Sequence, residues 1–184
     1  MRTRAAHGFT LIEVLVAVLV LAIGIGGAMA VQAAALRTRH LTSLMSGGVQ
    51  LAASLADRMR ANSVQMQAGS ANAYLQLRYN GDTDGPPAPP GVVCLGAASC
   101  SSGELASFDQ YEIKSALFSE FPGGRVAVCR DGVVWSGARR SLTWDCSAAP
   151  GAPLVIKLGW RDRRADSAAP VMPSVALVVA GAFP

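Results

Sequence analysis

The 184-residue chain contains only two histidines, His7 and His40, and none in the long segment that follows residue 40. A catalytic triad or proton relay based on histidine therefore has no candidate there. No glycine-rich loop carries the lysine of a phosphate-binding motif, and Asp82 and Asp84 lack the terminal glutamate of a calcium-binding loop. The sequence predicts no catalytic residues, no metal site and no cofactor, so we do not expect an enzyme.

Charged residues are also scarce, at 15% of the chain, with a formal net charge of +4. This balance is far from the dense basic patch of a dedicated nucleic-acid-binding protein. Arg139-Arg140 and the group Arg161, Arg163 and Arg164 could contact DNA or an acidic protein. Nearby aspartates favour a solvated surface instead, and nucleic acid is not an expected partner.

The four cysteines are Cys94, Cys100, Cys129 and Cys146, with C-x5-C and C-x16-C spacings. Zinc sites usually contain closer pairs such as C-x2-C. An even number of cysteines after an export-like segment is typical of disulfides in an oxidising compartment. The sequence does not decide how the cysteines pair, although it favours a bridge between Cys94 and Cys100 and another between Cys129 and Cys146.

A long apolar segment dominates the N-terminal part, because residues 14–36 contain no charged side chain. As a helix, with a rise of ~1.5 Å per residue, this segment is about 34 Å long, enough to cross a hydrocarbon core of roughly 30 Å. Glu13 immediately precedes it. Apolar residues recur at spacings of three and four from Leu41 to Met59, which predicts that the helix continues to about Asn62-Ser63.

Two ordinary classes explain this N-terminus incompletely. A secretory signal peptide accounts for Arg2, Arg4 and the Ala28-Met29-Ala30 triplet, but the apolar run is too long and begins at Glu13. An uncleaved membrane anchor accounts for the length and leaves Glu13 unexplained. Basic residues flank the segment on both sides, so the positive-inside rule does not orient it.

The leader MRTRAAHG followed by FTLIEV closely resembles the class III signal of type IV pilins and related pseudopilins. The resemblance implies that a prepilin peptidase cuts between Gly8 and Phe9 and methylates the new N-terminus at Phe9. Glu13 then becomes the fifth residue of the mature chain. It also implies a single span of the inner membrane with a periplasmic head before assembly, and a place in the pilus at the cell surface afterwards.

The chemistry of a carboxylate in a membrane agrees with that resemblance. A carboxylate near a bilayer centre costs about 2.5–3.5 kcal/mol on insertion scales, so Glu13 requires a partner. Cleavage creates an α-amine at Phe9, with an ordinary pKa of about 7.7–8. At ~4 Å and an effective dielectric constant near 20, its attraction to the Glu13 of a neighbouring subunit is about 4 kcal/mol before desolvation. Glu13 is therefore the predicted residue of intersubunit pairing; the simpler alternative is an unpaired carboxylate at the headgroup level.

Downstream stretches resemble a narrower group. LAASLADRMRANS at 51–63, then VAVCRD and WDC, and a late GW strand are similar to the minor pilin PilV family. This implies a minor pilin in a priming complex that starts pilus assembly, with prepilin peptidase, other minor pilins, the major pilin and a possible tip adhesin as partners. A minor pseudopilin of a type II secretion system and a single-pass anchored periplasmic binding domain remain alternatives.

The remaining pattern predicts an α+β fold of the type IV pilin kind, with a long N-terminal helix packed on a C-terminal antiparallel sheet. Short β-prone runs are RVAVCR, LTWDC, PLVIKLGW and SVALVVAG, with Cys129 and Cys146 expected on neighbouring strands. Residues 107–120 predict a helix that buries Phe108, Tyr111, Leu117 and Phe118, and residues 81–91 predict a loop. The expected segments are a cleaved leader (1–8), a transmembrane assembly helix (9–36), the periplasmic half of that helix (37–63) and a globular head (64–184).

Overall fold

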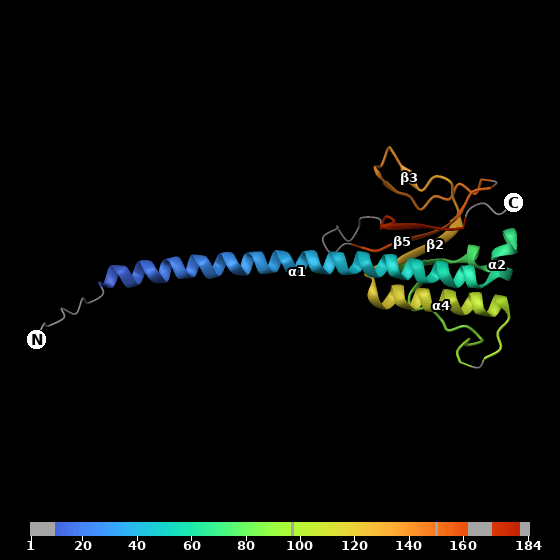
Figure 1. The fold of residues 1–184 in the computed structure, drawn as a ribbon, viewed down its shortest axis with the longest axis horizontal. Coiled ribbons are helices and arrows are strands. Elements are labelled where there is room, and N and C mark those ends of the chain that lie inside the picture. The colour runs from blue at the N-terminus through green and yellow to red at the C-terminus, as the bar shows by residue number, and fades with distance from the viewer. Residues whose placement is uncertain (1–9, 97, 150, 162–170, 181–184) are drawn as a thin grey trace, which may run out of the picture. The chain divides into compact units, whose positions relative to one another are not determined.

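The computed structural model describes residues 10–96, 98–149, 151–161 and 171–180. The chain divides into two compact units, Met1–Ser43 and Leu44–Pro184. One helix, α1 (Leu11–Ala61), runs through the boundary between them (Figure 1). This boundary falls inside the predicted segment 37–63, and the predicted leader lies outside the described residues.

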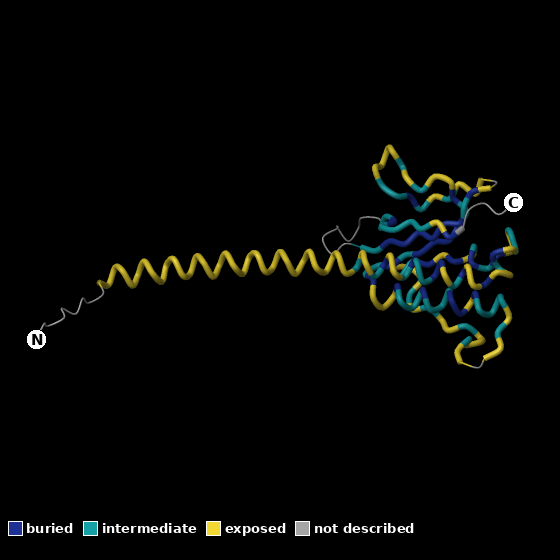
Figure 2. The backbone as a smooth tube through the Cα atoms, viewed as in Figure 1, coloured by how far each residue is buried: buried dark blue, intermediate teal, exposed yellow. Residues whose placement is uncertain are grey.

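In the first unit, α1 is apolar and exposed on every side (Figure 2). The helix forms readily because residues 10–61 contain no proline. Leu15 is 61% exposed and Ile23 68%, so the described part of this unit does not cover them. Among the described residues, α1 is the helix long and apolar enough to cross a membrane. A surface of this kind is stable only when lipid or other helices cover it.

The second unit contains the rest of α1 and all described strands. A four-stranded antiparallel sheet has the order β1-β2-β5-β6, and β3 pairs with β4 in a separate hairpin. The elements after α1 are α2 (Ser63–Gln67), η1 (Gly69–Ala71), η2 (Ala73–Gln76), β1 (Arg78–Asn80), α3 (Gly81–Asp84), α4 (Ser102–Glu120), β2 (Arg125–Arg130), β3 (Trp135–Ser136), β4 (Ser141–Leu142), β5 (Leu154–Gly159) and β6 (Val175–Ala180). The predicted α+β class is confirmed.

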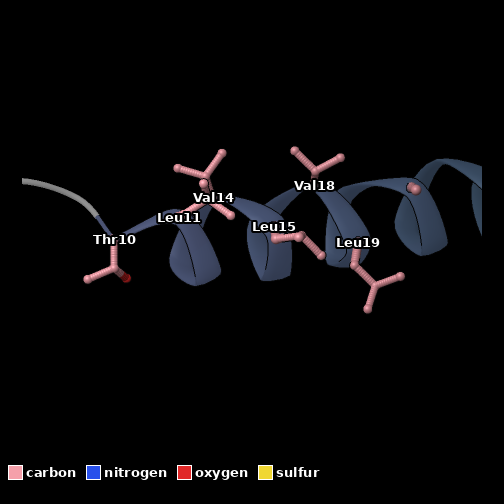
Figure 3. Close-up of a pocket in the computed structure, with 7 residues that line it drawn as sticks. Thr10, Leu11, Val14, Leu15, Val18 and Leu19 are labelled. Carbon is pink, nitrogen blue, oxygen red and sulfur yellow. The ribbon is translucent and has the colours of Figure 1, made fainter.

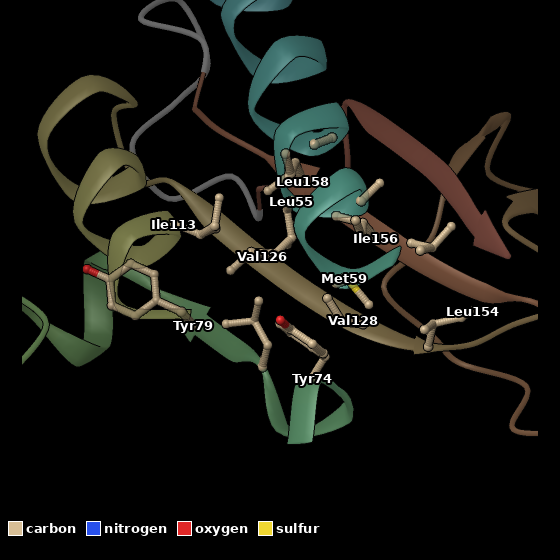
Figure 4. Packing of buried hydrophobic residues seen from close by; sticks show 14 of the residues in the cluster. Leu55, Met59, Tyr74, Tyr79, Ile113, Val126, Val128, Leu154, Ile156 and Leu158 are labelled. Carbon is tan, nitrogen blue, oxygen red and sulfur yellow. The ribbon is translucent and has the colours of Figure 1, made fainter. Parts of the chain in front are cut away.

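The main core lies between the sheet and the two long helices. Leu55 and Met59 of α1 are fully buried against the sheet side chains Val126, Val128 and Ile156 (Figure 4). Their spacing of four residues places them on one face of the helix, and alternate residues of β2 face them. The apolar period seen in the sequence is thus the face that packs into the core.

The opposite face of the sheet is covered by the segment between β2 and β5. Cys129 of β2 forms a disulfide with Cys146 in the loop after β4. Lys157 of β5 is fully buried there, and its Nζ donates to Asp131 Oδ2 at 2.5 Å and to the Asp145 carbonyl at 2.5 Å. Because both faces are covered, all six residues of β5 are buried.

Three of the element predictions need correction. LTWDC is not a strand beyond Leu142, and Cys146 lies in a loop. In this loop the Trp144 side chain is held by a hydrogen bond from its Nε1 to the Val171 carbonyl at 2.6 Å. Helix α4 begins at Ser102, since Ser101 and Glu104 form a capping box. Phe118 is 46% exposed, whereas Ile113 and Leu117 are buried.

The predicted loop at residues 81–91 also begins differently. Its first residues form the short helix α3, because the Asn80 side chain accepts the backbone N–H of Asp82 at 3.2 Å. Two carboxylates then hold this turn in place. Asp84 Oδ2 accepts the Asn80 N–H at 2.8 Å, and Asp82 pairs with Arg161.

Gly48 of α1 lets the Trp160 ring lie closer to the helix than a residue with a Cβ would allow. A Cβ added to Gly48 would lie 2.4 Å from the Trp160 ring, whose centroid is 5.2 Å from that of Phe121. A Cβ added to the adjacent Gly47 would lie 3.5 Å from Phe121, an ordinary contact. The Gly47-Gly48 pair therefore contains one replaceable glycine and one required glycine.

We predict that Gly48→Ala lowers the free energy of unfolding by about 1–3 kcal/mol, because the Trp160 ring must move. Gly47→Ala, the matched control, should raise stability by up to about 1 kcal/mol through helix propensity. Urea unfolding of the full chain in detergent micelles, followed by tryptophan fluorescence, measures both. Equal effects of the two substitutions would contradict this role of Gly48.

We also predict that Lys157→Met destabilises the protein by about 3–5 kcal/mol, because it leaves the Asp131 carboxylate buried without its ammonium partner. The double variant Asp131→Asn/Lys157→Met removes both charges and should recover much of that loss. Circular dichroism during urea unfolding measures these differences. A double variant no more stable than Lys157→Met would argue against an uncompensated charge as the cause.

The same pair gives the parent protein an acid sensitivity. Burial by itself raises the pKa of Asp131, but the hydrogen bonds from Lys157, Val133 N–H and Ser147 N–H together hold the pKa below its ordinary value. The stability that the ionised Asp131 carboxylate contributes is therefore complete above its unfolded-state pKa of about 3.9. It is lost as pH falls through the pKa of Asp131 in the folded protein. In the double variant this part of the acid sensitivity should be absent.

Candidate functional site

The candidate site is the exposed first part of α1. Glu13 lies in the first helical turn, and its N–H donates to the Thr10 carbonyl at 3.1 Å. The predicted cleavage and methylation residues, Gly8 and Phe9, lie outside the described residues. Cleavage after Gly8 would create a new N-terminus at Phe9, four residues before Glu13 in the sequence. Four residues correspond to about one turn of an α-helix.

One side of this helix carries large apolar side chains. Leu11, Val14, Leu15 and Val18 follow at spacings of three and four, and with Thr10, Leu19 and Ala22 they line a shallow apolar hollow (Figure 3). Each of these four large side chains is more than half exposed. Side chains of this shape fit lipid tails or the grooves of another apolar helix.

Glu13 lies on the other side. Counting along the helix, Glu13, Ala17, Val20, Gly24 and Gly27 are separated by alternating steps of four and three, so they share one face. Apart from the helix's own nearby backbone, no described atom lies within 4 Å of a Cβ added to Gly24 or Gly27, so this face is open. A second helix can approach most closely where the side chains are small. The carboxylate and the small residues therefore point to the same potential neighbour.

Residues 3–29 match the family model described as the prokaryotic N-terminal methylation motif. The match covers the processing signal and the start of α1, and it supports a type IV pilin-like protein. No curated protein and no solved structure matches the chain. Its apolar helix anchors the pilin-like protein in a membrane before assembly, and the processed chain is then incorporated into the pilus.

The remaining predicted site residues lie in the head of this pilin-like protein, the unit Leu44–Pro184. The structure pairs Cys94 with Cys100 in a loop just before α4, with 6.0 Å between Cα atoms. Cys129 and Cys146 form the second disulfide, with 6.1 Å between Cα atoms. The first bridge closes a local loop, and the second fixes the β3–β4 segment to the sheet.

The basic groups named from the sequence do not form one site among the described residues. Arg139 lies 3.8 Å from Asp145, and Arg161 pairs with Asp82. Arg163 and Arg164 lie outside the described residues. The two arginines with described partners thus form separate surface ion pairs.

A polar network at the end of α1 was not predicted from the sequence. Asp109 of α4 accepts a hydrogen bond from the Tyr74 hydroxyl at 2.5 Å and another from Arg58 Nη1 at 3.2 Å. Arg58 also pairs with Glu112. Asn62 Nδ2 donates to the Ser102 carbonyl at 2.8 Å. Tyr74 is fully buried, and burial together with the Asp109 carboxylate raises its pKa. The network joins α1, η2 and α4.

The sequence held one sign of this network. Arg58 falls next to the buried residue Met59 in a helix that is otherwise apolar on that side, and Asn62 follows where the helix ends. The partners are 12 to 54 residues away in sequence. Hydrophobic periodicity carries no information on such distant polar pairs.

We predict that Tyr74→Phe lowers the free energy of unfolding by about 1.5–3 kcal/mol, because it removes a buried hydrogen bond to a carboxylate. Tyr111→Phe is the matched control, since the Tyr111 hydroxyl makes no hydrogen bond to the described residues. Thermal and urea unfolding of the full chain measure the difference. If Tyr111→Phe costs as much as Tyr74→Phe, the Asp109 bond is not the cause.

Proposed function

We propose that this protein is a minor pilin that takes part in starting type IV pilus assembly and has no enzymatic activity. The observation that carries the proposal is the methylation motif at residues 3–29, which overlaps the beginning of an exposed apolar helix. The membrane-length run of that helix is preceded by one carboxylate, Glu13. The narrower assignment to the PilV family and to a priming complex rests on the resemblance of the stretches at 51–63 and around Cys129 and Cys146.

The proposed mechanism is assembly by charge pairing and helix packing. Prepilin peptidase cuts after Gly8 on the inner face of the inner membrane, and Phe9 receives the methyl group. The free amine of Phe9 then pairs with the Glu13 of a neighbouring subunit. The face with Gly24 and Gly27 allows the two helices to approach, and the opposite face packs against lipid or further helices. Prepilin peptidase, other minor pilins and the major pilin are the proposed partners.

Support for the pairing comes from electrostatics. An isolated carboxylate in hydrocarbon is costly, at about 2.5–3.5 kcal/mol on insertion scales. A neighbouring amine at ~4 Å offsets this cost at an effective dielectric constant near 20. The chain can place Glu13 in the membrane at low cost only in the company of another processed subunit.

We predict that Glu13→Leu abolishes incorporation into pili while leaving processing intact, because the substitution removes the charge and not the cut site. Glu13→Asp keeps the charge and should retain part of the function. Immunodetection in sheared pilus fractions measures incorporation. Intact mass of the membrane form measures processing as loss of residues 1–8 with gain of one methyl group.

The controls separate the alternatives. Glu13→Leu protein at parental levels in pili would contradict the pairing, and an intact Met1 would contradict a pilin altogether. A deletion strain that loses pili and twitching but still secretes enzymes supports the minor pilin. The reverse phenotype would indicate a type II secretion pseudopilin.

A further inference from the structure

A cleft beside the edge strand β1 carries two basic side chains. It measures about 590 Å³ and lies between β1, α4 and the proline-rich segment at 86–90. Its charged lining residues are Arg78, Asp84 and Lys114. Asp84 is already engaged, because it accepts the Asn80 N–H and the Thr83 hydroxyl, each at 2.8 Å.

Two cations in this cleft form no direct ion pair with the described residues. Neither Arg78 nor Lys114 forms an ion pair or a side-chain hydrogen bond within the part of the chain that the structure describes. Five other cations of the head, Arg58, Arg60, Arg139, Lys157 and Arg161, pair with a carboxylate. Arg125 instead stacks on Trp144, and Arg130 donates to the Ala152 carbonyl. Asp84 attracts Lys114 within the cleft, since hydrogen bonds from Asn80 and Thr83 lower the pKa of Asp84 and the charge of Lys114 lowers it further. The charged lining residues nevertheless sum to one net positive charge, which is complementary to an acidic ligand.

The edge of β1 offers main-chain groups at the same place. Val128 N–H donates to the Leu77 carbonyl at 3.0 Å, and Gly81 N–H to the Gly124 carbonyl at 2.8 Å. In an antiparallel pair, alternate residues face the partner strand, so Leu77, Tyr79 and Gly81 face β2. The N–H and C=O of Arg78 therefore point outward from the edge of the sheet, where no described group binds them.

The walls of the cleft are fixed in the unbound protein. Tyr79 Oη donates to the Gly85 carbonyl at 2.7 Å, which holds the start of the proline-rich wall. On the other side, Gln110 Nε2 donates to the Ala73 carbonyl at 3.1 Å. Little conformational entropy remains to be lost when such walls take up a ligand.

Arg78 also lines a second hollow, of about 420 Å³, in which Arg130 is a further basic residue. The two hollows therefore meet at Arg78. An elongated ligand that crosses the β1 edge would contact both hollows and meet basic side chains along its length. An extended peptide matches this path, because its N–H and C=O groups can pair with those of Arg78 while its side chains reach the cations.

We propose that the β1 edge is a docking site for an extended, acidic segment of a partner protein, with Arg78 binding both its main chain and a carboxylate, and Lys114 binding a second carboxylate. A nucleic acid fits the site less well, because the cations are few and the Arg78 main chain offers one donor and one acceptor in the spacing of a peptide. The site uses no residue of the assembly helix. It therefore stands or falls separately from the proposed function.

The test uses the full chain in nonionic detergent micelles and a fluorescent Thr-Glu repeat peptide of about eight residues, long enough to span ~27 Å when extended. Fluorescence anisotropy should show saturable binding that weakens with salt. Arg78→Glu and Lys114→Glu should each raise Kd about tenfold or more. Arg140→Glu is the matched control, because it makes the same charge change on the β3–β4 hairpin, and it should leave Kd within about twofold.

Three further probes make the result decisive. A Thr-Lys peptide and an oligo-dT strand of similar length should bind at least about tenfold more weakly than the Thr-Glu peptide. A Thr-Glu peptide with alternate backbone N-methyl groups should also bind weakly, because it cannot complete the main-chain pairing. Equal binding of the N-methylated peptide overturns the strand-edge contact. Absence of saturable Thr-Glu binding, equal oligo-dT binding, or an Arg140→Glu effect as large as that of Arg78→Glu overturns the site.

Discussion

The rest of this protein depends on an apolar helical surface that the described residues of its own unit do not cover. Along the first part of α1, large aliphatic side chains are more than half exposed, and a carboxylate lies at the beginning of the run. Water cannot be the environment of such a surface, and lipid alone is a poor environment for Glu13. Covering the helix and neutralising the carboxylate are therefore one requirement, which neighbouring subunits satisfy in the proposed assembly.

The same helix meets the opposite requirement in the head. From Gly48 to Met59 its apolar stripe is buried by the chain's own sheet, and Arg58 and Asn62 anchor its end to α4. The sheet is in turn closed on its far face by a disulfide and a buried ion pair rather than by a second helix. The head thus forms a closed core around α1 and leaves external contacts to other surfaces.

Features of the fold that have a regular period or a local motif could be predicted from the sequence. The α1 stripe, its end near Asn62 and the strands β2, β5 and β6 follow from spacing and composition. The position of Cys146 in a loop, the exposure of Phe118 and the Tyr74–Asp109 bond do not. Each of these depends on which distant segment lies opposite, and a one-dimensional pattern does not contain that information. The candidate site shows the same division, since the motif identifies Glu13 while the β1 cleft emerges only from the fold.

The arrangement of the two faces of α1 connects packing to electrostatics. Helices with large side chains at their contact pack at interaxial distances of 8–10 Å, whereas small residues permit a closer approach. Coulomb attraction falls with distance, so a carboxylate on the small-residue face gains more from a neighbour's amine than one on the face of Leu11 and Leu15. Gly24 and Gly27 lower helix propensity by about 1 kcal/mol each relative to alanine, and on the face of Glu13 that loss is offset by the shorter distance they allow. In the proposed assembly, the glycines and the carboxylate are therefore parts of one contact.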